Sequence, residues 1–155
     1  MGKFAVTAAV LGISLLSVAA FWMATESTDS SLAGPRPSNI RKCDESADYP
    51  LILQSFDVDH DLKPGKRSTM TAVFTPQKTT FFEQMQLQVF LKGTNVWNTK
   101  DTKHIDVTAG NPFTYNYSIL LPPFIPHVLV SMKMHFIGGE TKTEELSCVQ
   151  FDLQM

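Results

Sequence analysis

The chain has 155 residues, of which 43% are hydrophobic and 18% charged, and its formal net charge is −2. This length suits one globular domain rather than two, and the balance of apolar to charged residues is not that of a disordered chain. A near-neutral charge without long basic runs argues against nucleic acid as a partner, because proteins that bind nucleic acid carry a basic patch.

The first 24 residues are predicted to be a targeting segment. Lys3 precedes an uncharged apolar run from Phe4 to Ala24. Val18-Ala19-Ala20 supplies the small residues that signal peptidase needs, so we expect a cleaved signal peptide. The run also approaches the roughly 20 residues that span a bilayer, so a retained signal-anchor that tethers the protein to a membrane is the alternative. Either way we expect the rest of the chain outside the cytosol, secreted or in the lumen of an endosome, lysosome or vacuole.

Residues 25–42 are rich in Ser, Thr, Gly and Pro, a composition that predicts a flexible linker. The folded domain is therefore expected to span residues 43–155. The two cysteines of the chain, Cys43 and Cys148, bracket nearly all of it. In an oxidising compartment we expect them to pair, with two free thiols as the alternative.

Within residues 43–155 apolar residues recur at every second position, which indicates strands and not helices. In the clearest run Met85, Leu87 and Val89 alternate with glutamines. The expected strands are Leu51–Val58, Ser68–Thr75, Phe81–Leu91, a short Val96–Lys100 followed by a polar loop, Phe113–Leu121, His127–Ile137 and Glu144–Leu153. About seven short antiparallel strands separated by Pro and Gly turns predict an all-β, immunoglobulin-like β-sandwich of two sheets.

The sequence contains no recognisable catalytic set. It has neither a glycine-rich phosphate loop nor a nucleophile elbow. The four histidines are scattered: His60, between Asp59 and Asp61, is interpreted as part of a solvated turn, and His135 as a solvated residue on the polar face of a strand. We therefore predict a protein that is not an enzyme and that uses no metal or cofactor.

Two further features concern the faces of the expected strands. Asn116-Tyr117-Ser118 is an N-glycosylation sequon, and alternation places Asn116 on the face opposite the tyrosines, where it is a candidate for glycosylation. The apolar faces are rich in aromatic residues and in methionine, which adapts to varied shapes. By composition alone these residues fit an ordinary packed core as well as a binding site.

The order of short motifs from Cys43 onward resembles the ML lipid-recognition family across almost the whole domain. This family includes sterol-transfer proteins of the Niemann–Pick type C kind and fungal phosphatidylglycerol/phosphatidylinositol transfer proteins. The matching pieces are Cys43, Leu51-Ile52-Leu53, the turn Leu62-Lys63-Pro64-Gly65-Lys66, Leu87-Gln88-Val89-Phe90, Tyr117-Ser118-Ile119-Leu120-Leu121-Pro122, the segment from Pro126 to Val130, and Leu146-Ser147-Cys148-Val149-Gln150-Phe151. Further disulfides that many members carry are absent here, so the resemblance does not identify the ligand.

The resemblance implies an immunoglobulin-like sandwich with an apolar cavity between its sheets, a Cys43–Cys148 disulfide, and a sterol or phospholipid as partner. The protein would be a monomeric lipid-binding or transfer protein that touches membranes transiently. An immunoglobulin-like module that recognises protein, with an ordinary packed core, is the alternative function. The candidate lipid-lining residues are Phe74, Met85, Leu87, Val89, Trp97, Tyr115, Tyr117, Val130, Met132 and Phe136, of which Trp97 is also a candidate for the cavity mouth.

Overall fold

The computed structural model describes residues 37–59, 62–126 and 128–155, and these residues form eight strands. None of the described residues lies in a helix, so none belongs to a helix that could span a membrane. The strands are β1 (Ser38–Lys42), β2 (Leu51–Val58), β3 (Arg67–Pro76), β4 (Thr80–Leu91), β5 (Thr94–Val107), β6 (Phe113–Leu120), β7 (Leu129–Gly138) and β8 (Glu144–Gln154).

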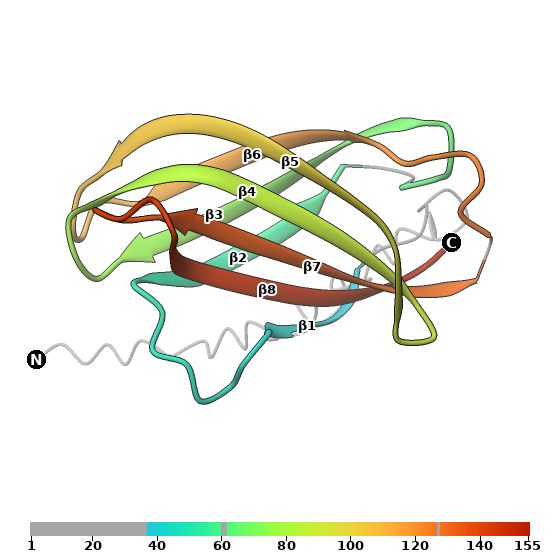
Figure 1. Cartoon of the computed structure of the whole chain (residues 1–155), viewed down its shortest axis with the longest axis horizontal. Coiled ribbons are helices and arrows are strands. Elements are labelled where there is room, and N and C mark those ends of the chain that lie inside the picture. Colours follow the sequence, from blue (N-terminus) through green and yellow to red (C-terminus); the bar gives the residue numbers. More distant parts are fainter. Residues whose placement is uncertain (1–36, 60–61, 127) are drawn as a thin grey trace, which may run out of the picture. The chain divides into compact units, whose positions relative to one another are not determined.

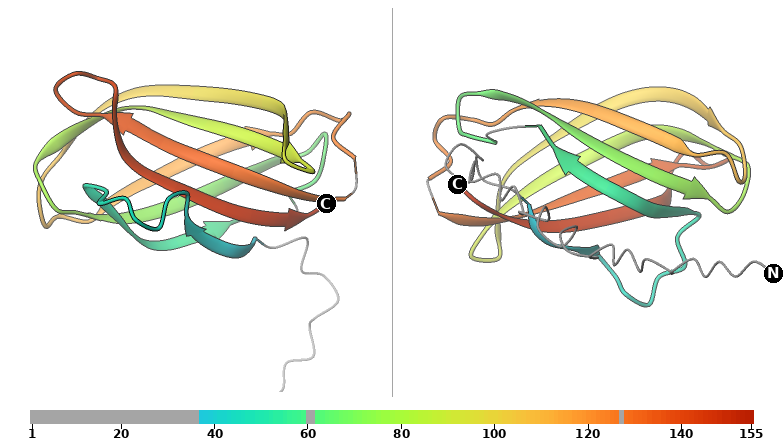
Figure 2. Two further views of the ribbon diagram at one scale, coloured as in Figure 1. Left: turned by 60° about the horizontal axis from the view of Figure 1, so that its bottom comes forward. Right: turned by 180° about the vertical axis from the view of Figure 1, so that it is seen from behind.

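The strands form two antiparallel sheets that pack face to face (Figures 1 and 2). One sheet has five strands in the order β1-β8-β7-β4-β5, and the other has three in the order β2-β3-β6. Apolar side chains alternate with polar ones along the central strands, so each sheet turns one apolar face toward the other. The predicted all-β sandwich of two sheets is confirmed.

The two sheets leave two seams where their edge strands face each other. At one seam β2 lies against β8, and these two approach each other most closely of the strands from opposite sheets. At the other seam β5 faces β6, and the backbones are farther apart. The sandwich is therefore narrower along the β2–β8 seam and wider along the β5–β6 seam.

Strand β5 is longer than its sequence indicates. The structure extends it from Thr94 to Val107, where the pattern predicts a short strand at residues 96–100 and then a polar loop. Its whole length pairs with β4, and it has no second neighbour in the sheet. Because an edge strand at an open seam buries little, its sequence keeps polar residues on both faces and loses the apolar alternation.

Strand β1 corrects the last residues of the predicted linker. Ser38–Lys42 pair with β8 at the edge of the five-stranded sheet. The N–H of Cys43 then donates to the carbonyl oxygen of Cys148, and the two cysteines form a disulfide with 5.3 Å between their Cα atoms. The expected pairing is thus confirmed. The predicted signal segment and the rest of the linker lie outside the described residues.

Candidate functional site

All ten candidate lining residues lie on the inner faces of the two sheets. Eight of them are buried in the core: Phe74, Met85, Leu87, Val89, Tyr115, Val130, Met132 and Phe136. The other two, Trp97 and Tyr117, are half-buried and pack against that core. The structure therefore brings the predicted set into one inter-sheet interior, while their role in binding lipid stays a prediction.

Aromatic rings fill the centre of this interior. The Phe74 and Phe136 rings, from opposite sheets, lie 4.7 Å apart between centroids in an edge-to-face arrangement. The Tyr115 ring makes the same kind of contact with Phe82 at 5.0 Å and with Phe136 at 5.5 Å. These rings are in contact across the two sheets, so a ligand at this point of the interior has to displace them.

Phe82 is fully buried at the centre of this cluster and was not among the predicted lining residues. Strict alternation counted back from the inward-facing Met85 would place Glu83 on the inner face of the sheet and Phe82 on the outer face. A bulge in β4 between Phe82 and Gln84 shifts the register, so that Phe82 faces the core. The sequence does carry one indication of this bulge: strict alternation would bury the charged side chain of Glu83.

A polar contact bridges the wider seam between β5 and β6. The hydroxyl of Tyr115 donates to Oδ2 of Asp101 at 2.5 Å, and Nζ of Lys103 lies 2.9 Å from the same oxygen. Lys103 also donates to the backbone carbonyl of Asn116 at 3.3 Å. We call Tyr115, Asp101 and Lys103 the seam clasp, because they connect the two sheets where the backbones do not touch.

Protonation in the seam clasp follows from its geometry. Partial burial alone raises the pKa of Asp101, but the Tyr115 hydroxyl and the Lys103 ammonium outweigh that effect and hold the pKa below its usual range. Burial, and then the hydrogen bond to the carboxylate, raise the pKa of Tyr115 well above its ordinary value. At neutral pH the clasp is therefore a neutral phenol that donates to a carboxylate paired with an ammonium group.

Trp97 and Tyr117 occupy the edge strands of the same seam. Trp97 lies on β5 in register with Val89, and Tyr117 lies on β6 in register with Met70. Both partners are buried, so the two aromatic side chains extend from the core to the rim of the seam. An aromatic ring with one polar edge suits such a boundary between an apolar interior and water.

A cavity of about 270 Å³ lies at the opposite, narrower seam. Its floor includes Leu51 and Val149, which are core residues, and its rim includes Arg41 and Lys42 from β1. The connection from β1 to β2 crosses between the sheets beside this cavity, and the disulfide ties its first residue to β8. This seam is therefore held by covalent connections as well as by packing.

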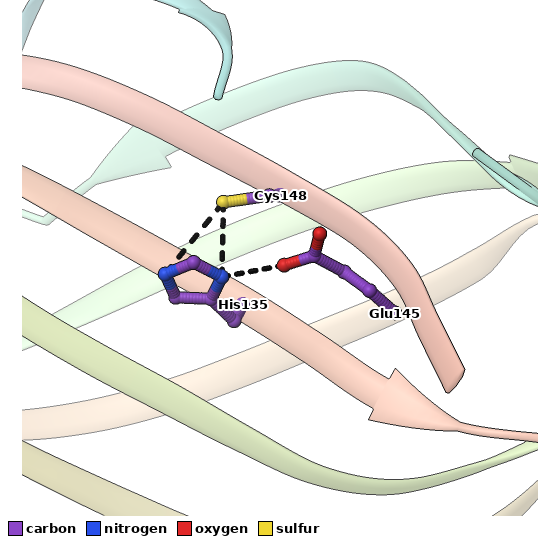
Figure 3. A group of neighbouring side chains, drawn as sticks. All are labelled: His135, Glu145 and Cys148. Atoms are coloured by element: carbon purple, nitrogen blue, oxygen red, sulfur yellow. Dashed lines mark hydrogen bonds and ion pairs between the residues drawn. The ribbon is translucent and has the colours of Figure 1, made fainter. Parts of the chain in front are cut away.

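One cluster of potential metal ligands lies outside the interior, on the outer face of the five-stranded sheet. Figure 3 shows His135 between the other two members: its Nδ1 lies 2.5 Å from Oε1 of Glu145 and 3.3 Å from Sγ of Cys148. Because Cys148 is in a disulfide, it offers no thiolate, and the group lacks the ligands of a metal site. The prediction of a solvated His135 is corrected, since its side chain is only 23% exposed and bonds to Glu145.

The candidate glycosylation site lies on β6. The Asn116 side chain is exposed, as alternation predicted, and its Oδ1 accepts a hydrogen bond from the Thr71 hydroxyl at 2.8 Å. Its exposure is compatible with access by a glycosyltransferase. Modification of Asn116 remains a prediction.

Comparison with known structures shows the same fold. The chain is similar to a Niemann–Pick type C2 protein from the Japanese carpenter ant, with a TM-score of 0.56, 10% identity, and coverage of 73% of this chain and 96% of that one. It is similar to chicken MD-1, crystallised in complex with lipid IVa, with a TM-score of 0.50, 16% identity and coverage of 74% and 86%. It is also similar to the C-terminal domain of wzt, with a TM-score of 0.52, 12% identity and coverage of 79% and 76%. At such identities these likenesses show the fold alone.

The family assignment comes from the sequence. No curated protein matches the chain. The model of one family, described as ML domain, matches residues 37–155, which is the β-sandwich together with its edge strand β1. Because that match covers more than half of the chain, the protein belongs to the ML domain family.

Proposed function

We propose that this protein binds a lipid between its two sheets and carries it in a compartment outside the cytosol. Membership of the ML domain family is the observation that carries this proposal. The complex of chicken MD-1 with lipid IVa supports lipid as the ligand class for a sandwich of this fold. The Cys43–Cys148 disulfide supports an oxidising environment, secreted or endolysosomal.

The interior has the chemistry that an acyl chain or a sterol requires. Methionines from both sheets line it, among them Met70, Met85 and Met132, and unbranched thioether side chains rearrange readily around a guest. A bound lipid gains roughly 0.8 kcal/mol for each methylene group that leaves water. Backbone hydrogen bonds run within each sheet, so separating the sheets costs packing contacts but no ladder bonds.

We place the mouth of the site at the β5–β6 seam. The backbones are farther apart there, and the connection across the seam is made by the side chains of the seam clasp. At the β2–β8 seam the strands lie closer, and the disulfide restrains the crossing segment. Trp97 and Tyr117 then lie at the mouth, where each contacts the guest or the water boundary.

The most direct test is the lipid content of the purified protein. Organic extracts of protein from its own secretory compartment are analysed by mass spectrometry, and we expect one lipid class at near-stoichiometric amount. Denatured and refolded protein is then titrated with a fluorescent sterol and a fluorescent phospholipid. Both proteins carry Trp22→Phe, so that Trp97 is the single tryptophan of the chain. Energy transfer from Trp97 then reports proximity, and the additional Trp97→Phe variant is the control.

Extracts without lipid, together with no energy transfer that depends on Trp97, would contradict the proposal. That pair of results would instead favour the alternative function, a protein-recognition module with an ordinary packed core. Energy transfer that persists in Trp97→Phe would show that the probe binds elsewhere.

A further inference from the structure

The connection between β6 and β7 exposes an unusual number of apolar side chains at one end of the sandwich. Among the described residues, seven large hydrophobic side chains are exposed, and four of these fall in residues 120–129. They are Leu120, Phe124, Val128 and Leu129, and Phe124 is the most exposed of all at 68%. A cluster of this kind on a protein surface indicates contact with a partner.

This exposure is imposed by the fold. Leu121 and Ile125 are fully buried on either side of Phe124 and anchor the connection to the core. The N–H of Ile125 donates to the carbonyl of Pro122 at 3.2 Å, which closes a turn with Phe124 inside it. Pro122, Pro123 and Pro126 restrict the backbone further. The chain therefore holds the phenyl ring out in water on an ordered turn.

Cationic side chains border the apolar cluster on one side. The N–H of Gly65 donates to the carbonyl of Leu121 at 2.9 Å, which places the β2–β3 turn against the β6–β7 connection. Lys66 follows in that turn, and Arg67 pairs with Leu120 in the β3–β6 ladder. Both cations are exposed, and within the described part of the chain neither makes an ion pair.

Two anionic groups of this end belong to described residues. Asp59 donates its N–H to the carbonyl of Thr69, which is two residues deeper in β3 than Arg67. The terminal carboxylate belongs to Met155, whose N–H bonds to the carbonyl of Val128 on the side of β7 and β8. Among the described residues, Lys66 and Arg67 thus lie nearer to Leu120 than either of these anionic groups.

We propose that this end of the protein docks on the surface of a membrane that contains anionic phospholipids. Phe124, Leu120 and Leu129 enter the boundary between headgroups and acyl chains, while Lys66 and Arg67 bind headgroup phosphates. A protruding aromatic ring with cations beside it is the pattern of interfacial membrane attachment.

The docking surface is independent of the lipid site between the sheets. None of its exposed residues lines the interior, and the connection lies at the end of the sandwich that also holds the β2–β3 turn and the C-terminus (Figure 1). Docking and the retention of an extractable lipid can therefore succeed or fail separately.

An environment-sensitive fluorophore tests where the protein touches the membrane. Phe124→Cys and Ile52→Cys variants of the full chain are each labelled with a nitrobenzoxadiazole maleimide. Ile52 is an exposed apolar residue in register with Thr75, at the far end of β3 from Arg67, and serves as the matched control. Because both variants share the same N-terminal residues, any difference between them reports on the two positions alone.

With vesicles of phosphatidylcholine and phosphatidylglycerol, we expect the emission at position 124 to rise and to be quenched by spin-labelled lipid. We expect no change at position 52, and a much smaller change at 124 with phosphatidylcholine alone. The double variant Lys66→Gln/Arg67→Gln should weaken binding about five-fold for each cation, which corresponds to roughly 1 kcal/mol per charge. Lys78→Gln/Lys100→Gln makes the same change in net charge away from this end and should bind like the unmodified protein.

Three results would overturn the proposal. One is equal emission at positions 124 and 52 in the presence of anionic vesicles. Another is equal binding by the two double-charge variants. The last is a rise at position 124 without vesicles, accompanied by a dimer in sedimentation velocity, which would make this face an interface between copies of the chain.

Discussion

Removing one oxygen atom from the seam clasp tests how the two sheets are held together at the β5–β6 edge. In Tyr115→Phe the ring keeps its contacts with Phe82 and Phe136, and only the hydroxyl that donates to Asp101 is lost. Tyr117→Phe is the matched control, because Tyr117 lies on the same strand and its hydroxyl makes no hydrogen bond with a described residue.

The size of the effect follows from the charge and exposure of the acceptor. A hydrogen bond to a charged group contributes about 1.5 to 3 kcal/mol to stability. The Asp101 side chain is 27% exposed and keeps Lys103 at 2.9 Å, so water and the ammonium group compensate in part. We therefore expect Tyr115→Phe to lower the free energy of unfolding by about 1.5 kcal/mol, and Tyr117→Phe to change it by less than about 0.5 kcal/mol.

The contribution also depends on pH with a definite sign. Because the folded-state pKa of Asp101 lies below its unfolded value, the stabilisation is present above the ordinary carboxyl pKa of about 4. It is lost as the pH falls through the lowered folded-state value. The difference between the native protein and Tyr115→Phe should therefore be full at neutral pH and shrink in acid.

Urea denaturation followed by circular dichroism measures these differences, and a double-mutant cycle with Asp101→Ala isolates the pair, because alanine leaves no acceptor for the Tyr115 hydroxyl. We expect a coupling energy of about 1 kcal/mol or more between positions 115 and 101. Additive effects of the two substitutions, or equal losses in Tyr115→Phe and Tyr117→Phe, would refute the clasp. If Tyr115→Phe loses the same free energy of unfolding at neutral pH and in strong acid, the acceptor of the Tyr115 hydroxyl is not an ionised Asp101.

Three other substitutions test the packing and the covalent restraint. Replacing Cys43 and Cys148 by serine opens a loop closed across 105 residues and should destabilise the protein by about 4 to 5 kcal/mol on the chain-entropy estimate. The native protein in reductant should unfold at the same urea concentration as this serine variant. Phe82→Ala should cost about 3 to 5 kcal/mol, whereas Phe90→Ala, on the outer face of the same strand, should cost far less; equal losses would contradict the bulged register. Gly138→Ala should fail to fold stably, because its methyl group would lie 2.0 Å from a backbone carbonyl oxygen of β4, and a well-folded variant with native thermal stability would disprove that contact.

The strands were predictable wherever one face of a strand is buried and the other is exposed to solvent. In β3 and β7 the alternation is strict, and the predicted strands lie within one or two residues of the observed ones. β5 lacks that pattern because it is an edge strand, and β1 lacks it because all five of its residues are exposed. Edge strands are specified by backbone pairing with a neighbour, which local sequence does not reveal.

The candidate site was predictable as a set of inward positions but not as a geometry. Alternation identified residues such as Phe74 and Met132 because each belongs to an unbroken strand. It missed Phe82, because the bulge in β4 reverses which face of the sheet the side chains before Gln84 occupy. It also gave no indication that Asp101 would meet Tyr115, because that contact joins strands of different sheets across the wider seam.

Strand β1 has a consequence for how the chain can be processed. It is the outermost strand of its sheet, and its pairing covers the backbone edge of β8. Processing that ends before Ser38 leaves this cover in place. A cut after Lys42 would release the strand while the disulfide keeps Cys43 attached, and β8 would then present a row of free N–H and C=O groups to any passing strand. Five surface residues thus separate a sandwich whose β8 edge is covered from one that is open to strand exchange and aggregation.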